Sequence, residues 1–306
     1  MLRRVLFHLS ESARARNFVV SHPLARRASR RFVAGETLDE AMALIDRLAE
    51  SGYYAILNHL GERIAEPQEA ENAVRDYLEA LERLRGRPSA RDCYVSVKLT
   101  QLGLDFDRGL AIGHLRRLLA AARQDGTFIR IDMEHSSYVD ATLDIIEQMR
   151  NEGYERLGAV IQAYLYRSEA DVDRLLRLGV PIRLVKGAYM EPPTIAYPRM
   201  EDVNACFLRI QGRLLRDRAY HAIGTHDEQL VEAAVAQARA EGIGADRFEF
   251  QFLYGVRRDL QARLAAGGWR VRLYVPYGTH WYPYFMRRMA EHPANLFFIL
   301  RNVLRR

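Results

Sequence analysis

The sequence predicts an α/β protein built on a (β/α)8 barrel of the TIM type, with extra helices at its N-terminus. Its 306 residues are 49% hydrophobic and 27% charged, which is typical of a folded chain and excludes disorder. Eight short runs of β-branched and aromatic residues alternate with longer amphipathic runs. The Gly-x-Gly-x-x-Gly turn that an open dinucleotide-binding sheet requires does not occur. We therefore expect the eight strands to close into a parallel barrel.

The elements follow in order along the chain. A helix is expected first in TLDEAMALIDRLAESG, where Thr37 and Glu40 form a capping box and Gly52 ends the helix. Strands are expected to start at Tyr53, Tyr94, Phe128, Ala159, Ile182, His221, Phe248 and Val271. Helices are expected over 68–85, 108–123, 139–151, 169–178, 201–218, 227–241, 257–266 and 281–290. We treat 1–306 as one domain, with an N-terminal helical segment, 1–51, and a barrel with C-terminal helices, 52–306.

Positive charge is concentrated near the N-terminus. Lys and Arg outnumber Asp and Glu by 45 to 39, and the first 31 residues hold eight arginines against the single acid Glu11. Farther along, acids and bases alternate as they do on ordinary solvated helices. A nucleic-acid-binding barrel stays an alternative, but the aromatics lie at the strand ends and form no basic groove, so we expect no nucleic acid partner.

Cysteine use and hydropathy indicate a cytoplasmic protein. Cys93 and Cys206 lie far apart without metal-ligand spacing, so no disulfide framework is expected. No apolar run approaches the roughly 18 residues of a membrane span. The segments VLFHLSESARAR and LFFILRNVLRR combine apolar and cationic residues, so peripheral contact with the inner face of an anionic membrane is open.

Polar residues stand at the end of nearly every predicted strand. Barrel enzymes place their chemistry at these carboxyl ends, although a single polar strand end is equally explained by solvent contact. Charges inside apolar strand runs are harder to explain, because a buried charge needs a partner or a ligand. Lys98, Asp132, Arg183 and Lys186 are four such charges. Together they predict a site with a positive excess, suited to a carboxylate or phosphate.

The last predicted helix carries a second candidate group. Arg287 and Arg288 are adjacent in WYPYFMRRMAEH, and Tyr284 precedes Arg288 by one turn. An arginine fork holds a carboxylate through two parallel hydrogen bonds, although a hydrated surface pair explains the spacing as well. In VKGAYMEPP, Gly187 and Ala188 directly follow a strand, where small residues let backbone approach a ligand closely.

These residues lie within segments that resemble proline dehydrogenase, of the short, single-function bacterial type. The likeness covers roughly residues 52–295, and its segments are LNHLGE, SVKLT, RIDMEHSSYVDATL, VIQAYLYR, RLVKGAYMEPPTIAYP, GTHDEQL, FEFQFLYG and RLYVPYGTHWYPYFMRRMAEHP. The resemblance implies a distorted (β/α)8 barrel with FAD at its mouth. It also implies oxidation of L-proline to Δ1-pyrroline-5-carboxylate by hydride transfer to flavin N5, the first step of proline catabolism to glutamate.

The resemblance also implies roles for single residues. Lys98, Arg287 and Arg288 would bind the proline carboxylate, with Tyr274, Tyr284 and Leu253 around the ring. Asp132 and Arg183 would lie at the reacting centre, Asp132 holding Lys98 or Tyr274 and Arg183 beside the flavin. Glu62 would pair with an active-site arginine and gate the pocket. The FAD would be held by Met133, Gln162, Arg183, Val185, Lys186, Gly187, Ala188, Tyr189, Thr225 and His226.

Two positions depart from the family pattern. Met190 stands where some members have tryptophan, which puts a stacking contact with the flavin in doubt, and Asn58 replaces an expected aspartate. Family members pass electrons to a membrane quinone, which would give the basic termini a reason to meet a bilayer. A transient contact with pyrroline-5-carboxylate dehydrogenase is also open.

A metal-dependent barrel hydrolase is the main enzyme alternative. Its ligands would come from His59, Glu134, His135 and His226. Such sites commonly begin with two histidines one residue apart at a strand end, and the chain contains no His-x-His. We therefore expect no metal.

Overall fold

The computed structural model describes residues 29–61, 64–90 and 92–291, and these residues form a closed barrel of eight parallel strands. Neighbouring strands pair in sequence order, and β1 closes the barrel on β8 in a register that runs from Tyr54 opposite Arg272 to His59 opposite Tyr277. The predicted barrel is confirmed. Its strands are β1 (Tyr54–His59), β2 (Tyr94–Val97), β3 (Ile129–Ile131), β4 (Leu157–Gln162), β5 (Ile182–Val185), β6 (His221–Gly224), β7 (Phe248–Leu253) and β8 (Val271–Tyr277).

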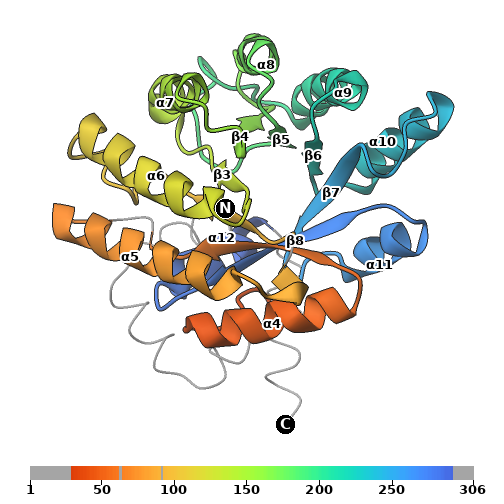
Figure 1. Cartoon of the computed structure of the whole chain (residues 1–306). Helices are drawn as coiled ribbons and strands as arrows, with labels where there is room; N and C mark the ends of the chain where they lie inside the picture. The colour runs from red at the N-terminus through yellow and green to blue at the C-terminus, as the bar shows by residue number, and fades with distance from the viewer. Residues whose placement is uncertain (1–28, 62–63, 91, 292–306) are drawn as a thin grey trace.

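Helices form a ring around the barrel (Figure 1). They are α4 (Leu38–Glu50), α5 (Pro67–Leu84), α6 (Arg108–Arg123), α7 (Val139–Asn151), α8 (Ser168–Arg177), α9 (Met200–Arg216), α10 (Glu228–Ala240) and α11 (Arg258–Ala266). A further helix, α12 (Trp281–Glu291), lies at the centre of this view. Two short 3-10 turns, η1 (Pro88–Ala90) and η2 (Ser136–Tyr138), precede β2 and α7. Each predicted helix of the barrel lies within two residues of its observed bounds.

Strands β1 and β3 start one residue later than predicted, and β4 differs most from its prediction. The run from Ala159 to Leu165 was expected to be a strand, but β4 starts at Leu157 and ends at Gln162. The predicted strand starts too late because it excludes Gly158, since glycine is a poor strand former. In the structure, the missing side chain of Gly158 makes room for the Phe128 ring. The apolar run continues beyond the strand as a turn, in which Leu165 N donates to Gln162 O at 3.1 Å.

Helix α4 begins with the predicted capping box. Glu40 N donates to Thr37 Oγ1 at 3.3 Å, and Thr37 N donates to Glu40 Oε2 at 3.3 Å. Gly52, in the left-handed region at φ +78°, follows the last turn of the helix. Met42 and Ile45 are buried on the inner face of α4, which packs against β1 and β8. The N-terminal helix therefore covers the seam where the barrel closes.

Helix α12 packs over the carboxyl ends of the strands. It follows β8, and Trp281 and Phe285 are buried in a separate apolar cluster with Leu60 and Val256, which follow β1 and β7. Phe32, from the segment that precedes α4, joins the same cluster. This helix therefore brings its residues to the face of the barrel where the candidate site was expected.

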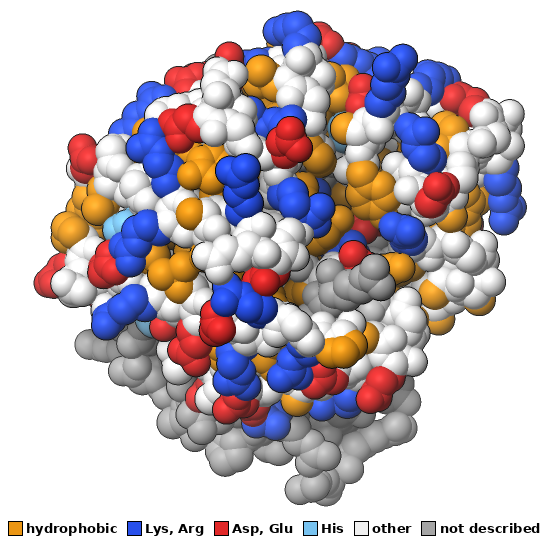
Figure 2. Space-filling view, in the orientation of Figure 1, with side chains coloured by type: hydrophobic (Ala, Val, Ile, Leu, Met, Phe, Trp, Pro, Cys, Tyr) orange, Lys and Arg blue, Asp and Glu red, His pale blue; other side chains and the backbone are white. Residues whose placement is uncertain are grey.

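The described surface carries mixed charge. In Figure 2, Lys and Arg side chains alternate with Asp and Glu over the visible face. Among the described residues, no helix has the length and apolar character needed to cross a membrane. The two terminal segments singled out for membrane contact lie outside the described residues, and of the eight N-terminal arginines only Arg30 and Arg31 lie within them.

Candidate active site

Asp132 is the centre of a buried polar cluster at the mouth of the barrel. Its Oδ2 accepts hydrogen bonds from Lys98 Nζ at 3.1 Å and from the Tyr274 hydroxyl at 2.7 Å. Its Oδ1 accepts from Arg183 Nη2 and from the Ser96 hydroxyl. All five residues are at most 9% exposed. A single carboxylate thus joins two cations and two hydroxyls.

The barrel geometry brings these residues together. Lys98 and Asp132 directly follow β2 and β3, while Arg183 and Tyr274 lie within β5 and β8. Contacts between strands that are not neighbours require side chains that point into the barrel. Ser96 shares this inward side with Lys98, because side chains two residues apart in a strand face the same way. Four separate segments therefore meet at one point.

The electrostatics of the cluster favour an anionic ligand. Burial alone would raise the pKa of Asp132, but Lys98 and Arg183, together with the hydroxyls of Ser96 and Tyr274, bring that pKa well below its usual range. Burial and the negative charge of Asp132 raise the pKa of Tyr274 well above its usual value, so the phenol keeps its proton. Two cations face one carboxylate, which leaves an excess of one positive charge.

Helix α12 adds an arginine and a tyrosine beside this cluster. The Arg288 guanidinium lies over the Tyr284 ring, 5.1 Å from its centroid. Arg288 is 8% exposed, which excludes the alternative of a hydrated surface arginine at this position, whereas Arg287 is partly exposed. Leu253 pairs with Tyr274 in the sheet register and packs against the apolar cluster of α12. Leu253 therefore connects the strand that carries Tyr274 to the apolar cluster of α12.

The predicted cofactor residues occupy the other half of the mouth. Met133 follows β3, and the others lie on or directly after three neighbouring strands, β4, β5 and β6. The side-chain amide of Gln162 donates to Glu134 O at 2.8 Å. Lys186 Nζ donates to Asp227 Oδ2 at 2.6 Å, and Asp227 N donates to Thr225 Oγ1 at 3.2 Å. These contacts join the end of β4 to the segment after β3, and the loop after β5 to the loop after β6.

Gly187 has a packing role that the sequence did not show. Its φ is +120°, and a Cβ atom there would lie 2.3 Å from the ring of Tyr164. The missing side chain of Gly187 makes room for this ring, and the expected approach of its backbone to a ligand stays a prediction. Val185, Ala188 and Tyr189 flank the same turn, and the ring of Tyr189 lies 4.2 Å from that of His135, centroid to centroid.

Sequence reasoning missed two residues of the site. Ser96 was missed because serine is common in strands. The signal that could have indicated it is its position two residues before Lys98, which places both side chains on the same side of the strand. Asp227 caps α10 by accepting from Gln229 N, and it also pairs with Lys186. Glu62, the predicted gate, lies outside the described residues.

The residues of the alternative metal site are engaged separately. His59 Nε2 lies 3.7 Å from Asp76 Oδ2, and His135 Nδ1 lies 3.5 Å from Glu191 Oε1. Glu134 accepts hydrogen bonds from Thr100, and the His226 ring lies beside Phe252. Within residues 29–61, 64–90 and 92–291, no group of three or more His, Cys, Asp or Glu side chains has the arrangement of a metal site.

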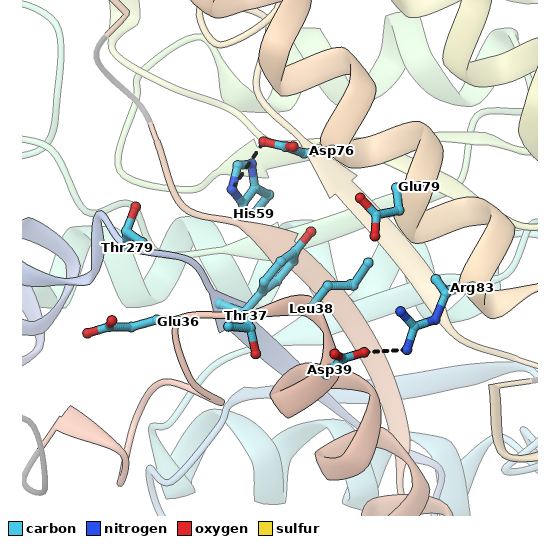
Figure 3. Close-up of a pocket in the computed structure, with 10 residues that line it drawn as sticks. Glu36, Thr37, Leu38, Asp39, His59, Asp76, Glu79, Arg83 and Thr279 are labelled. Carbon is cyan, nitrogen blue, oxygen red and sulfur yellow. Dashed lines mark hydrogen bonds and ion pairs between the residues drawn. The ribbon is translucent and has the colours of Figure 1, made fainter.

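An acidic cavity lies beside the mouth but does not contain the Asp132 cluster. It has a volume of about 390 Å³ and is lined by residues of α4 and α5 and of the ends of β1 and β8. Figure 3 shows Glu36, Asp39, Asp76 and Glu79 around it, with Arg83 paired to Asp39. The side chains around this cavity are mainly negative, whereas the Asp132 cluster has an excess of positive charge. The two places therefore suit different ligands.

Comparison with known proteins decides the family. A family model described as proline dehydrogenase matches residues 41–301. The chain belongs to the proline dehydrogenase family. It is therefore an oxidoreductase of proline catabolism, and its length matches short, single-function members. "Proline dehydrogenase 1" of Bacillus subtilis subsp. natto is 39% identical over 306 residues and is covered completely, as is this chain.

Other relatives agree. "Proline dehydrogenase" of Deinococcus radiodurans is 41% identical over 279 residues, which cover 90% of this chain and 89% of that protein. A crystal structure of proline utilization A from Bdellovibrio bacteriovorus, inactivated by N-propargylglycine, superimposes with a TM-score of 0.81 and 25% identity. It covers 87% of this chain, and the chain spans 33% of that longer protein. The proline dehydrogenase barrel is thus one part of the longer protein.

Proposed function

We propose that this proline dehydrogenase oxidises L-proline to Δ1-pyrroline-5-carboxylate with FAD as its cofactor, and that electrons pass on to a quinone. The observation that carries the proposal is the Asp132 cluster, which joins both halves of the barrel mouth. Lys98 and Tyr274 belong to the half proposed for substrate, and Arg183 belongs to the half proposed for cofactor. A ring held on one side and a flavin held on the other would meet above Asp132.

The substrate half binds an amino acid by its carboxylate in this proposal. Arg288, Arg287 and Lys98 supply the positive charge, and a guanidinium fork matches a carboxylate with two parallel hydrogen bonds. Tyr284, Tyr274 and Leu253 supply apolar surface for a saturated ring and exclude water from it. The glutamate at position 62 would close this half by pairing with an arginine.

Asp132 keeps the cluster in one arrangement. It holds the ammonium of Lys98, the phenol of Tyr274 and the guanidinium of Arg183 through three separate hydrogen bonds. Because its pKa is well below the usual range, it stays ionised throughout the physiological range and acts as an orienting anion, and it does not act as a proton donor. Arg183 then places positive charge where negative charge increases during reduction.

The residues present fit a flavin dinucleotide. The half of the mouth formed by β4, β5 and β6 is rich in hydrogen-bond donors, which match the carbonyl and ring-nitrogen acceptors of a flavin and the anionic pyrophosphate. Bound FAD supplies the acceptor for the hydride that leaves the ring carbon next to nitrogen. The residues proposed to hold it are Met133, Gln162, Arg183, Val185, Lys186, Gly187, Ala188, Tyr189, Thr225 and His226.

The proposal also covers location and partners. We place the enzyme in the cytoplasm, with peripheral contact of its basic N-terminal segment at the inner membrane face, where a quinone accepts electrons. Loss of vesicle binding after the arginines at positions 3, 4, 14 and 16 are replaced by glutamine would support this contact. A transient contact with pyrroline-5-carboxylate dehydrogenase would relay the product.

The deciding experiment is an absorption spectrum of the purified protein, followed under anaerobic conditions as L-proline is added. A flavin spectrum that bleaches with proline is the expected result. A colourless protein that cannot be reconstituted with FAD would refute the flavin proposal. A bound flavin that ignores proline would refute the substrate while leaving the cofactor in place.

A further inference from the structure

A second polar layer lies beneath the Asp132 cluster, inside the barrel. The side chain of Gln251, on β7, accepts at Oε1 from Arg183 Nη1 at 3.4 Å and donates from Nε2 to Glu249 Oε1 at 2.5 Å. Gln251 is 4% exposed and Glu249 is 1% exposed. Neither Gln251 nor Glu249 has a role in the proposed chemistry, but the two hydrogen bonds connect both residues to Arg183.

Glu249 is anchored to the far end of the barrel. Its Oε1 also accepts from Arg272 Nε at 2.7 Å, and its Oε2 accepts from the Tyr220 hydroxyl at 3.1 Å. Arg272 in turn donates to the backbone carbonyls of Ala55 and Asp92. A chain of hydrogen bonds thus runs from the backbone at the amino ends of the strands to the guanidinium of Arg183.

The contacts of residue 251 require an amide. One neighbour, Arg183, offers only donors, and the other, Glu249, offers only acceptors. A glutamine side chain satisfies both at once, with its oxygen toward the arginine and its nitrogen toward the glutamate. A carboxylate there would meet Glu249 with no donor, and an apolar side chain would leave both neighbours without this partner.

Charge in this layer is also unbalanced toward the positive. Arg130, buried on β3, donates to the carbonyls of Ala159 and Pro181, and burial, followed by the positive charge of Arg183, lowers its pKa to about 9. Glu249 pairs directly with Arg272, and its negative charge also acts on Arg130. Its charge offsets theirs within a low-dielectric interior.

We infer that Gln251 and Glu249 are positioning residues for the oxidation. Gln251 fixes the plane of the Arg183 guanidinium, and Glu249 sets the electrostatic potential around it. The inference rests on the proposed function in one respect, namely that Arg183 lies beside the flavin. The contacts themselves are independent of the flavin, so the test has one arm without it.

The arm without flavin tests the contact between the two residues through thermal unfolding of flavin-free protein. Q251E brings two carboxylates together, so its unfolding midpoint is expected to fall. The double variant E249Q/Q251E separates the two carboxylates again, because the amide at position 249 can donate to the carboxylate at position 251, but it weakens the contact with Arg272 and is therefore expected to recover only part of the loss. An unchanged midpoint in Q251E, or no recovery in the double variant, would overturn the inference whatever the cofactor proves to be.

The arm with flavin tests the positioning of Arg183 by kinetics. In Q251M, kcat with proline is expected to fall about tenfold while KM changes less than twofold, because Arg183 and not the carboxylate clamp loses a partner. Q211M is the matched control, since Gln211, on α9, is also a buried amide, and its side chain bonds to Leu230 O and Ala234 N of α10, away from the site. Equal kinetic loss in both variants, or none in Q251M, would refute the role of Gln251.

Measurement of the midpoint potential of the bound flavin distinguishes an electrostatic role of Glu249 from a packing role. E249Q removes an anion, so the potential is expected to rise; E249Q/Q251E moves the anion toward Arg183, so the potential is expected to fall below that of the wild type. Shifts in the same direction, or no shift, would overturn the electrostatic role of Glu249. If wild-type protein holds no flavin that proline reduces, the proposed function fails, and with it this part of the inference.

Discussion

Replacement of Asp132 by asparagine tests the architecture of the site most directly. The substitution conserves shape and removes the one carboxylate that Lys98, Arg183 and Tyr274 share. Both cations are less than 9% exposed, and removal of one partner from such a buried ion cluster costs about 3–5 kcal/mol. At roughly 2.1 cal/mol/K per residue of unfolding entropy, 306 residues convert this loss into a fall of roughly 5–8 °C in the unfolding temperature.

The assay is thermal unfolding followed by circular dichroism at several pH values. The pKa of Asp132 is lowered by folding, so its contribution is present above the pKa of an unfolded aspartate and is lost only as pH falls through the lower folded value. The difference between wild type and D132N is therefore expected to stay constant from neutral pH to about pH 5 and to shrink only in stronger acid.

Two further variants complete this test. Asp202→Asn removes a carboxylate that pairs with the exposed Arg199, and it is expected to leave the unfolding temperature unchanged. The double variant K98M/D132N removes one cation together with the anion and is expected to lose less stability than D132N alone. An unfolding temperature of D132N within 1 °C or so of the wild type would refute the buried ion cluster, given the cost expected for an unpaired charge.

Three other predictions follow from single contacts. Arg288→Ala is expected to raise the KM for proline roughly 10- to 100-fold with the flavin-to-protein absorbance ratio unchanged, because a charged hydrogen bond to the carboxylate is lost; loss of flavin would contradict our division of the mouth. Gly187→Ala places a Cβ against the Tyr164 ring at a φ of +120°, so it is expected to lower the unfolding temperature. Its control, Gly113→Ala on α6, places a Cβ in open space and is expected to raise the unfolding temperature slightly. Equal effects of the two substitutions would count against the packing role of Gly187. Thr37→Ala removes the cap of α4 and is expected to cost about 1 kcal/mol in denaturant unfolding, so an unchanged midpoint would show that the capping box contributes nothing.

The sequence predicted the barrel because its period was unambiguous. Strands of three to seven residues alternate with amphipathic helices, and that alternation can be recognised in a single sequence. The prediction erred where tertiary packing outweighs local preference: Gly158 begins the core of a strand because the Phe128 ring needs its missing side chain. Neighbours of this kind come from distant segments, so no local pattern indicates them.

The site was predictable in part for a different reason. Lys98, Asp132 and Arg183 stood out because charge inside an apolar strand run is costly, and the structure shows that they contact one another. Ser96 did not stand out, because a neutral polar residue in a strand carries little cost and has many explanations. Arg130, Glu249 and Arg272 are also buried charges within strands, and they were not predicted as part of the site.

The interior of this barrel also changes how substitutions there should be interpreted. Barrels of this class usually fill the interior with layers of branched apolar side chains. Here the inward positions form a polar network of Ser96, Asp132, Arg183, Glu249, Gln251 and Arg272. The groups that shape the electrostatics of the site are therefore also groups that hold the strands in register. Arg272 contacts Glu249 and the backbone near β1 and β2, and it is not among the residues proposed to hold the cofactor. Loss of cofactor in a variant such as R272M would therefore be explained by destabilisation of the barrel. A direct cofactor contact is established only when cofactor affinity falls while the unfolding temperature of the flavin-free protein stays the same.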